Sequence, residues 1–369
     1  MERIYLDYNA TSIIDSEVTK WMVDLLSNQI SLNPSSIHAD GRKARAMMED
    51  ARAMITQNLA INSKLDDVGI IFTSSGTEAN NLAISNFQGN PFFVSAAEHV
   101  SVLDIDHPNK IIIPVDKNGL VRLEELSSLL KQYPGKKIVS IMLANNETGA
   151  INDIKSLSEV AHSEGAIFHC DGSQAFCKIK IDFNDLGCDL LTISSHKSGG
   201  PVGAAALVAK KSLALKPVFK GGKQEQGLRA GTENLLAIGG FAVAAQYCDE
   251  KVQKFIEIEA LRDYLEQEIS KVAPITILSK EVLRLPNTSC LSMPGIKNEE
   301  QLIKFDLAGI SLSAGSACSS GRIAGSHVLK AMGLDEKIAS EFIRVSLGLR
   351  TTKEQIDKFI EIWKGIYKK

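Results

Sequence analysis

The segment 74–81, Ser-Ser-Gly-Thr-Glu-Ala-Asn-Asn, directly follows an apolar run that ends at Thr73. A strand, a small-residue turn and a helix start present free backbone N–H groups at the positive end of a helix dipole. Such a position can bind phosphate, although an ordinary N-cap formed by a Ser or Thr side chain is the commoner reason for the pattern. The chain has no GxGxxG or GxxxxGK[ST] motif, so a phosphate bound here would belong to a smaller ligand.

Two later apolar runs end in residues with complementary chemistry. Asp171 follows the run 166–170, Gln174 lies three residues further on, and His196 and Lys197 follow the run 190–195. Ligands of open α/β sheets bind at the carboxyl ends of strands. An Asp facing a pyridinium nitrogen and a Lys able to form a Schiff base are the groups that pyridoxal 5′-phosphate (PLP) needs most. Taken alone, Asp171 is more readily a turn residue and Lys197 a strand-end residue. Together with the possible phosphate-binding turn at 74–81, they predict a PLP site.

The small-residue stretch 313–325 contains Cys318 among Ser, Ala and Gly. It can bury little apolar surface, so we expect a mobile loop with an accessible thiol near Arg322 and His327. The alternative is an incidental surface cysteine. The other five cysteines lie in strand or helix patterns that fit a buried core: Cys170, Cys177, Cys188, Cys248 and Cys290.

Arg344 is a lone charge in the apolar context Ile-Arg-Val-Ser-Leu-Gly. A buried guanidinium requires a carboxylate partner. That partner is either a structural Asp or Glu, the commoner case, or the α-carboxylate of an amino-acid substrate, and Arg350 competes for the second role.

These residues require a scaffold in which strands and helices alternate. Apolar runs at 68–73, 91–95, 110–114, 137–143, 166–170 and 190–194 predict strands, and helices are expected from Glu78 and over 123–131 and 154–163. This alternation is typical of an α/β fold with a mostly parallel sheet. Beyond about residue 250 we expect a helix over 251–271, strands at 276–278 and 288–293, and a closing helix over 353–367. The sequence therefore predicts a large domain over 16–250 and a smaller α+β domain formed by 1–15 and 251–369.

The composition restricts the possible partners and the cellular setting. The chain has 369 residues, a formal net charge of −3 and no basic cluster typical of nucleic-acid or membrane-surface binding. It shows neither an apolar signal segment nor a membrane-span pattern. There is no CxxC pair and no zinc-ligand spacing. We expect a cytoplasmic protein with reduced thiols and no metal.

Ten short segments, in this order, resemble the cysteine desulfurases of the nitrogen-fixation and iron–sulfur-cluster type, which are fold-type I (aspartate-aminotransferase-like) PLP enzymes. The resemblance extends over essentially the whole chain. The segments are LDYNAT (6–11), NPSSIH (33–38), SGTEANN (75–81), EH (98–99), NNETG (145–149), DGSQ (171–174), SHK (195–197), RAGT (229–232), GSAC (315–318) and IRVSLG (343–348).

The resemblance implies a role for each matching residue at the cofactor. Lys197 is expected to bind the PLP aldehyde, Asp171 to pair with the pyridine nitrogen and His99 to stack on the ring and assist catalysis. Two residues would contact the ring hydroxyl: Asn146 and Gln174. Five would bind the phosphate, the last one from the other subunit of a homodimer: Gly76, Thr77, Ser194, His196 and Thr232.

For the substrate, the resemblance implies that Arg344 binds the carboxylate of L-cysteine, with Asn33 or Asn146 helping. Cys318 would attack the substrate sulfur and hold it as a persulfide, releasing L-alanine. The sulfur would then pass to an acceptor protein, either an iron–sulfur scaffold or a tRNA-thiolation relay.

Departures from the family pattern are few. The usual Pro is missing from Asn9-Ala-Thr-Ser-Ile13, and Lys223 replaces a Gly before Gln224. The chain ends at Lys369, whereas housekeeping members carry a longer tail that helps to dock the scaffold, so we expect a nitrogen-fixation-like or specialised member. A selenocysteine lyase and a non-catalytic sulfur-relay protein of the same fold remain alternatives, and Cys318 argues against an aminotransferase.

Overall fold

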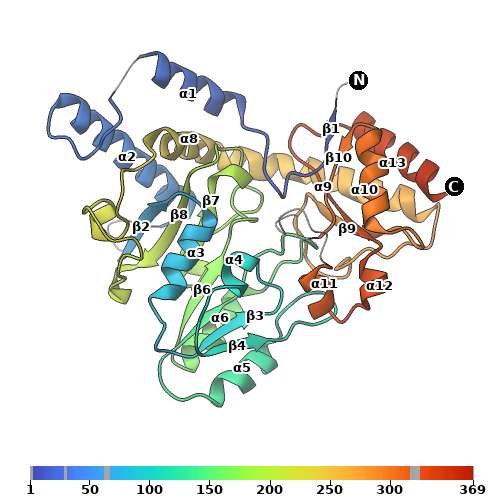
Figure 1. Ribbon diagram of the computed structural model, residues 1–369, viewed down its shortest axis with the longest axis horizontal. Helices are drawn as coiled ribbons and strands as arrows, with labels where there is room; N and C mark the ends of the chain where they lie inside the picture. Colours follow the sequence, from blue (N-terminus) through green and yellow to red (C-terminus); the bar gives the residue numbers. More distant parts are fainter. Residues whose placement is uncertain (1–2, 29–30, 62–66, 316–324, 369) are drawn as a thin grey trace.

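The computed structural model describes residues 3–28, 31–61, 67–315 and 325–368 (Figure 1). Its strands are β1 (Ile4–Tyr5), β2 (Val68–Thr73), β3 (Phe92–Ser95), β4 (Lys110–Ile113), β5 (Lys137–Ser140), β6 (Ala166–Asp171), β7 (Leu190–Ser194), β8 (Ala205–Lys210), β9 (Thr288–Ser292), β10 (Ile310–Ser311) and β11 (Phe342–Ser346). Its helices are α1 (Ser16–Ser27), α2 (Ala39–Asn58), α3 (Gly76–Ser85), α4 (Val100–Leu103), α5 (Leu123–Lys131), α6 (Ile154–Ser163), α7 (Phe183–Leu186), α8 (Leu235–Gln246), α9 (Cys248–Ser270), α10 (Asn298–Leu307), α11 (His327–Ala331), α12 (Glu336–Ala339) and α13 (Lys353–Tyr367), with short 3-10 turns at Ser195–Lys197, Lys211–Leu213 and Glu225–Gly227.

A seven-stranded sheet forms the centre of the molecule, in the order β2-β8-β7-β6-β5-β3-β4. The pairs β3–β4, β3–β5, β5–β6 and β6–β7 are parallel, whereas β8 is antiparallel to both of its neighbours. Parallel strands need crossover connections, which the intervening helices supply. The predicted α/β fold with a mostly parallel sheet is confirmed.

Local sequence signals explain several of these boundaries. Helix α5 has Glu124 and Glu125 in its first turn and Lys131 in its last, which complements the helix dipole. Helix α13 begins with a capping box between Thr352 and Gln355. Gly165 follows the end of α6 with a φ of 72°, the left-handed conformation that glycine adopts most easily.

A second hydrophobic core lies beside the sheet, where the orange and red C-terminal elements gather around β9 and β11 (Figure 1). Leu6 from the N-terminal segment is buried in this core with Phe255, Phe359 and Trp363. Strand β1 pairs in parallel with β10, so the chain start is part of the C-terminal layer. Helix α9 contributes to both cores: Cys248 at its start is buried in the core of the large sheet, and Phe255, further along the same helix, is buried in the second core.

Three of the differences between the predicted and the observed elements are informative. Helix α3 begins at Gly76, two residues before the expected Glu78. The expected strand at 276–278 is wrong, since this stretch contributes only the isolated bridge Ile277–Leu291. Strand β8, with the sequence AALVAK, was not predicted because its residues favour helices, and burial between β2 and β7 determines its conformation instead.

Candidate active site

A cavity of about 340 Å³ lies between the carboxyl ends of β6 and β7 and the N-terminus of α3. Its volume is in the range of small-ligand sites. Of the residues singled out from the sequence, it brings together Gly76, Thr77, His99, Asn146, Asp171, Gln174, Ser194, His196, Lys197 and Arg344.

Asp171 is a buried carboxylate held by donors from two elements. Its Oδ2 accepts a hydrogen bond from Asn80 Nδ2 at 2.9 Å, and its Oδ1 accepts from the Ser173 N–H at 2.9 Å. Burial favours the neutral acid, but the hydrogen bonds from Ser173 and Asn80, together with the positive charge of Lys197, outweigh it and lower the pKa of Asp171. The carboxylate is therefore ionised at neutral pH, as pairing with a protonated pyridine nitrogen requires.

His99 lines the same cavity and is linked to Asp171 through two polar side chains. Asn80 Nδ2 also donates to Ser101 Oγ at 2.8 Å, and Ser101 Oγ lies 2.8 Å from His99 Nδ1. The Ser101 N–H donates to the same Nδ1, so the neutral ring carries its proton on Nε2. Burial, followed by the charge of Lys197, lowers the pKa of His99 to about 4. A neutral, oriented imidazole is suited to contact an aromatic ring.

The end of the cavity beside α3 has the character of an anion site. Ser75 caps the helix, since its side-chain oxygen accepts a hydrogen bond from the Glu78 N–H at 3.2 Å. The N-cap and the possible phosphate-binding position are therefore in the same turn. Gly76 and Thr77 occupy the first turn, where backbone N–H groups have no preceding turn to accept them. Ser194 Oγ is buried and has no hydrogen-bond partner among the described residues. An orphan hydroxyl facing a helix N-terminus fits a phosphate.

The opposite wall is a buried amide network. Gln174 Nε2 donates to the Asn9 carbonyl at 2.9 Å, and Gln174 Oε1 accepts from Lys178 Nζ at 2.9 Å. Asn9 Nδ2 in turn donates to the Asn146 carbonyl at 3.2 Å. Asn146 Oδ1 is buried without a partner among the described residues. These contacts fix the Gln174 amide and the Asn146 backbone, and the unpaired Asn146 Oδ1 marks a place for a ligand donor.

Arg344 forms the substrate side of the cavity and is 2% exposed. Its Nη2 lies 2.6 Å from Asp7 Oδ1, and its Nη1 donates to the Asn146 carbonyl at 3.0 Å. Arg350 instead donates to the Ile14 carbonyl at 3.0 Å and does not line this cavity. The structural carboxylate expected as an alternative partner of Arg344 is thus Asp7, and the guanidinium still borders the cavity.

The chain is similar to known proteins over nearly its whole length. The model of the family "Aminotransferase class-V" matches residues 4–359. The chain belongs to the class-V aminotransferase family. Among its relatives, "Cysteine desulfurase IscS" of Dictyoglomus turgidum is 38% identical over 99% of this chain and 95% of that protein. "Cysteine desulfurase NifS" of Azotobacter vinelandii is 35% identical over 98% and 91%. The solved structure of a NifS-like protein from Rickettsia africae has a TM-score of 0.95 and 40% identity, covering 100% of both chains.

Two predicted site residues do not line the cavity, and a third lies outside the described residues. Asn33 is exposed, and its Oδ1 accepts from the Ser35 N–H at 3.0 Å. Thr232 is exposed and lines a separate open depression that Ser75 and Thr77 also border. Cys318 lies outside the described residues, as does Arg322. The roles expected for these residues stay predictions.

The described residues on either side of segment 316–324 nevertheless lie close to the cavity. Before it, Ser313 forms a backbone bridge with Arg344. After it, Ser326 Oγ donates to the buried Glu147 at 2.5 Å, and His327 Nε2 lies 2.8 Å from the carbonyl oxygen of Glu98, the neighbour of His99. The described residues that flank the segment are therefore hydrogen-bonded to Arg344, which lines the cavity, and to Glu147 and Glu98, which are next in the chain to lining residues.

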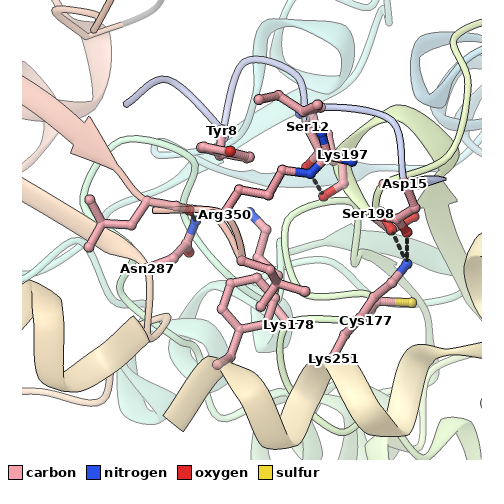
Figure 2. Close-up of a pocket in the computed structure, with 16 residues that line it drawn as sticks. Tyr8, Ser12, Asp15, Cys177, Lys178, Lys197, Ser198, Lys251, Asn287 and Arg350 are labelled. Carbon is pink, nitrogen blue, oxygen red and sulfur yellow. Dashed lines mark hydrogen bonds and ion pairs between the residues drawn. The ribbon is translucent and has the colours of Figure 1, made fainter. Parts of the chain in front are cut away.

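A second, smaller cavity of about 70 Å³ lies on the other side of Lys197 (Figure 2). Lys178, Lys197 and Lys251 surround it, and Lys251 is paired with Asp15 at 2.5 Å. Its volume corresponds to about two water molecules, which is too small for a cofactor. Lys197 thus has its cofactor-sized space on one side only.

Sequence reasoning missed four polar residues that organise the site: Asn9, Asn80, Ser101 and Lys178. Asn9 and Asn80 stand within matched motifs, and a buried asparagine inside a helix, as Asn80 is in α3, could have been noticed as requiring a partner. Ser101 and Lys178 have no comparable local signal. The five described cysteines are all buried and free, as expected.

None of the described helices is long and apolar enough to cross a membrane. Among the described residues, no group of three or more His, Cys, Asp or Glu side chains is arranged to hold a metal ion.

Proposed function

We propose that this member of the class-V aminotransferase family is a PLP-dependent cysteine desulfurase that moves sulfur from L-cysteine to Cys318. The main support is the single cavity that holds Lys197, Asp171 and Arg344 together, close to the described residues that flank the segment containing Cys318. The relatives named cysteine desulfurase, aligned over almost the whole chain, support the same reaction.

The residues present fit PLP. Asp171 would pair with the pyridine nitrogen, His99 would lie on the ring, and Lys197 would bind the aldehyde. The ring hydroxyl would be contacted by Asn146 and Gln174, and the phosphate by Gly76, Thr77, Ser194 and His196. The orphan oxygens of Ser194 and Asn146 are the observations that favour this fit. When bound, PLP supplies an electron sink for negative charge at the substrate Cα.

The chain's own residues then account for the chemistry. Arg344 would bind the substrate carboxylate, and the Lys197 amine would accept the Cα proton. The Cys318 thiolate would attack the substrate sulfur, forming an S–S bond while the substrate C–S bond breaks and its electron pair goes to carbon. Protonation of that carbon, and return of a proton from Lys197 to Cα, would give L-alanine. The balance is L-cysteine plus a thiol giving L-alanine plus a persulfide, with no external oxidant.

The wider setting remains part of the proposal. A homodimer would bring the partner subunit's Thr232 to the phosphate, and the open depression at Ser75 and Thr77 supports a contact there. Transfer of sulfur to an iron–sulfur scaffold or a tRNA-thiolation relay, and a cytoplasmic location with reduced thiols, stay predictions.

The test is sulfide release from L-cysteine in the presence of a reductant. The wild type should release sulfide and L-alanine in equal amounts. Cys318→Ala should lose sulfide release while keeping the absorbance of bound PLP. Cys188→Ala, which removes a buried thiol remote from the cavity, should keep both. Release by Cys318→Ala at the wild-type rate would show that the persulfide mechanism is wrong.

A further inference from the structure

Asp7 joins three segments that are far apart in the sequence. Its Oδ1 lies 2.6 Å from Arg344 Nη2 on β11, and its Oδ2 accepts a hydrogen bond from Ser313 Oγ at 2.7 Å. The backbone of Asp7 bridges Ser346, and the backbone of Ser313 bridges Arg344. Both oxygens of the Asp7 carboxylate are thus bound, one by the Arg344 side chain and one by the Ser313 side chain. The backbones of Arg344 and Ser313 are also paired with each other.

This geometry leaves Arg344 fixed but not saturated. A guanidinium has five N–H donors in a rigid plane. One donates to Asp7 and one to the Asn146 carbonyl, while Nε is buried without a partner among the described residues. The side chain lines the cavity that contains Lys197. The Arg344 guanidinium is thus oriented by two hydrogen bonds and has further N–H donors with which it can bind a second carboxylate.

We infer that Asp7 is a positioning residue, whose carboxylate orients Arg344 to receive the α-carboxylate of the amino-acid substrate, with Ser313 orienting Asp7 in turn. The inference rests on the proposed function and specifies how its substrate is selected. Selectivity for a carboxylate-bearing amine would then depend on a residue that does not touch the substrate.

The physical reason is orientation as well as charge. Burying an unneutralised guanidinium is costly, and Asp7 makes ion-pair contact with this one. If Asp7 loses its charge, Arg344 can reorient toward the other acceptor beside it, the Asn146 carbonyl, and the geometry offered to the substrate is lost. Ligand binding is sensitive to such small displacements.

The experiment compares two amines that differ by one carboxylate. L-Alanine and ethylamine are titrated into the PLP-loaded full-length protein, and their affinities are taken from the change in cofactor absorbance. Asp7→Asn should weaken L-alanine binding roughly tenfold and leave ethylamine binding unchanged. Arg344→Ala should show the same selectivity, and adding Asp7→Asn to it should weaken L-alanine no further.

The matched control is Glu266→Gln, which removes the charge from another buried pair of an arginine and a carboxylate, Arg284–Glu266 at 2.8 Å. It should lower stability without changing the ratio of the two affinities. If Asp7→Asn does not fold, Ser313→Ala removes only the hydroxyl that holds Asp7 and should give a smaller loss, roughly threefold, again for L-alanine alone.

Equal weakening of both amines, or no change in L-alanine binding, would refute the positioning role. If the wild type itself does not prefer L-alanine to ethylamine, the carboxylate clamp is wrong, even where sulfide release from L-cysteine upholds the desulfurase. A protein that neither binds PLP nor releases sulfide would instead refute the proposed function.

Discussion

Several residues that line the cavity were predictable because they have a local sequence signal. Asp171 and Lys197 follow buried apolar runs, and Gly76 stands at a strand-to-helix turn. The pairing of Arg344 with Asp7 was not predictable, since 337 residues separate the two. Only the fold brings together partners that lie so far apart along the chain.

Lys197 lines the cavity, the buried Lys178 is hydrogen-bonded to Gln174 of its wall, and the two lysines should differ in one chemical test. Reduction of the PLP-loaded protein with borohydride should fix the cofactor to Lys197, and Lys197→Ala should lose both this label and turnover, the latter by roughly 10³-fold. Lys178→Met should keep the label, because Lys178 Nζ is hydrogen-bonded to Gln174 and Asn9. Peptide mapping after reduction reads out the result, and a label retained in Lys197→Ala would contradict the assignment.

At the scale of elements, strand boundaries were predicted most accurately where the strand is a run of buried apolar residues, and less well where its composition is mixed. Strands β2 and β7 were predicted at their observed bounds, since apolar β-branched residues favour a buried strand. Strand β8 was missed because Ala, Leu and Lys favour helices, and only its place between two other strands makes it extended. Tertiary context, which the sequence does not display, decides such cases.

The turn 145–149 supports both the cofactor wall and Arg344, so a change in its backbone should affect stability and substrate binding together. Gly149 has a φ of 79°, and an added Cβ would lie 2.9 Å from the Thr288 Cβ. Gly149→Ala should lower the free energy of unfolding by roughly 2–4 kcal/mol and raise the KM for L-cysteine.

Gly135→Ala is the matched control for this turn. Gly135 has a φ of 89° but no atom within 4 Å of an added Cβ, so its cost is the backbone conformation alone, about 1–2 kcal/mol, with KM unchanged. Denaturant unfolding and steady-state kinetics measure the two effects. Equal losses of stability in the two variants would show that contact with Thr288 is unimportant.

At the scale of the whole molecule, separate hydrophobic cores share one chain, and the N-terminal segment belongs to the core formed mainly by the C-terminal elements. The parallel sheet was predictable from the alternation of elements. The packing of Leu6 and β1 against β10 and β11 was not predictable from local sequence, because these segments are far apart along the chain. The separate cores support the proposed division near residue 250, which remains a prediction.

A buried histidine in the central sheet should make the whole fold sensitive to mild acid. His169 is hydrogen-bonded between Ser140 and Thr192, and burial lowers its pKa to about 4. The folded-state pKa is below the ordinary 6.5, so between these values the unfolded chain binds the extra proton and stability falls as pH falls. From pH 7 to 5, His169 should account for a loss of roughly 2 kcal/mol.

Denaturant unfolding at the two pH values, with the same cofactor loading, measures this loss. His169→Gln should show a smaller decrease between pH 7 and pH 5, whatever its absolute stability. An identical decrease in the variant would exclude His169 as a source. His99 and His196, whose pKa values are also lowered to about 4, should contribute in the same direction.

The central claim concerns the sulfur atom and the cysteine that receives it. The most direct measurement is the mass of the Cys318 peptide after the PLP-loaded protein reacts with L-cysteine carrying a heavy sulfur isotope, followed by alkylation without reductant. We predict that this peptide gains one labelled sulfur atom while the peptides of the five buried cysteines gain none. An unlabelled Cys318 peptide in a protein that still produces L-alanine would contradict the account.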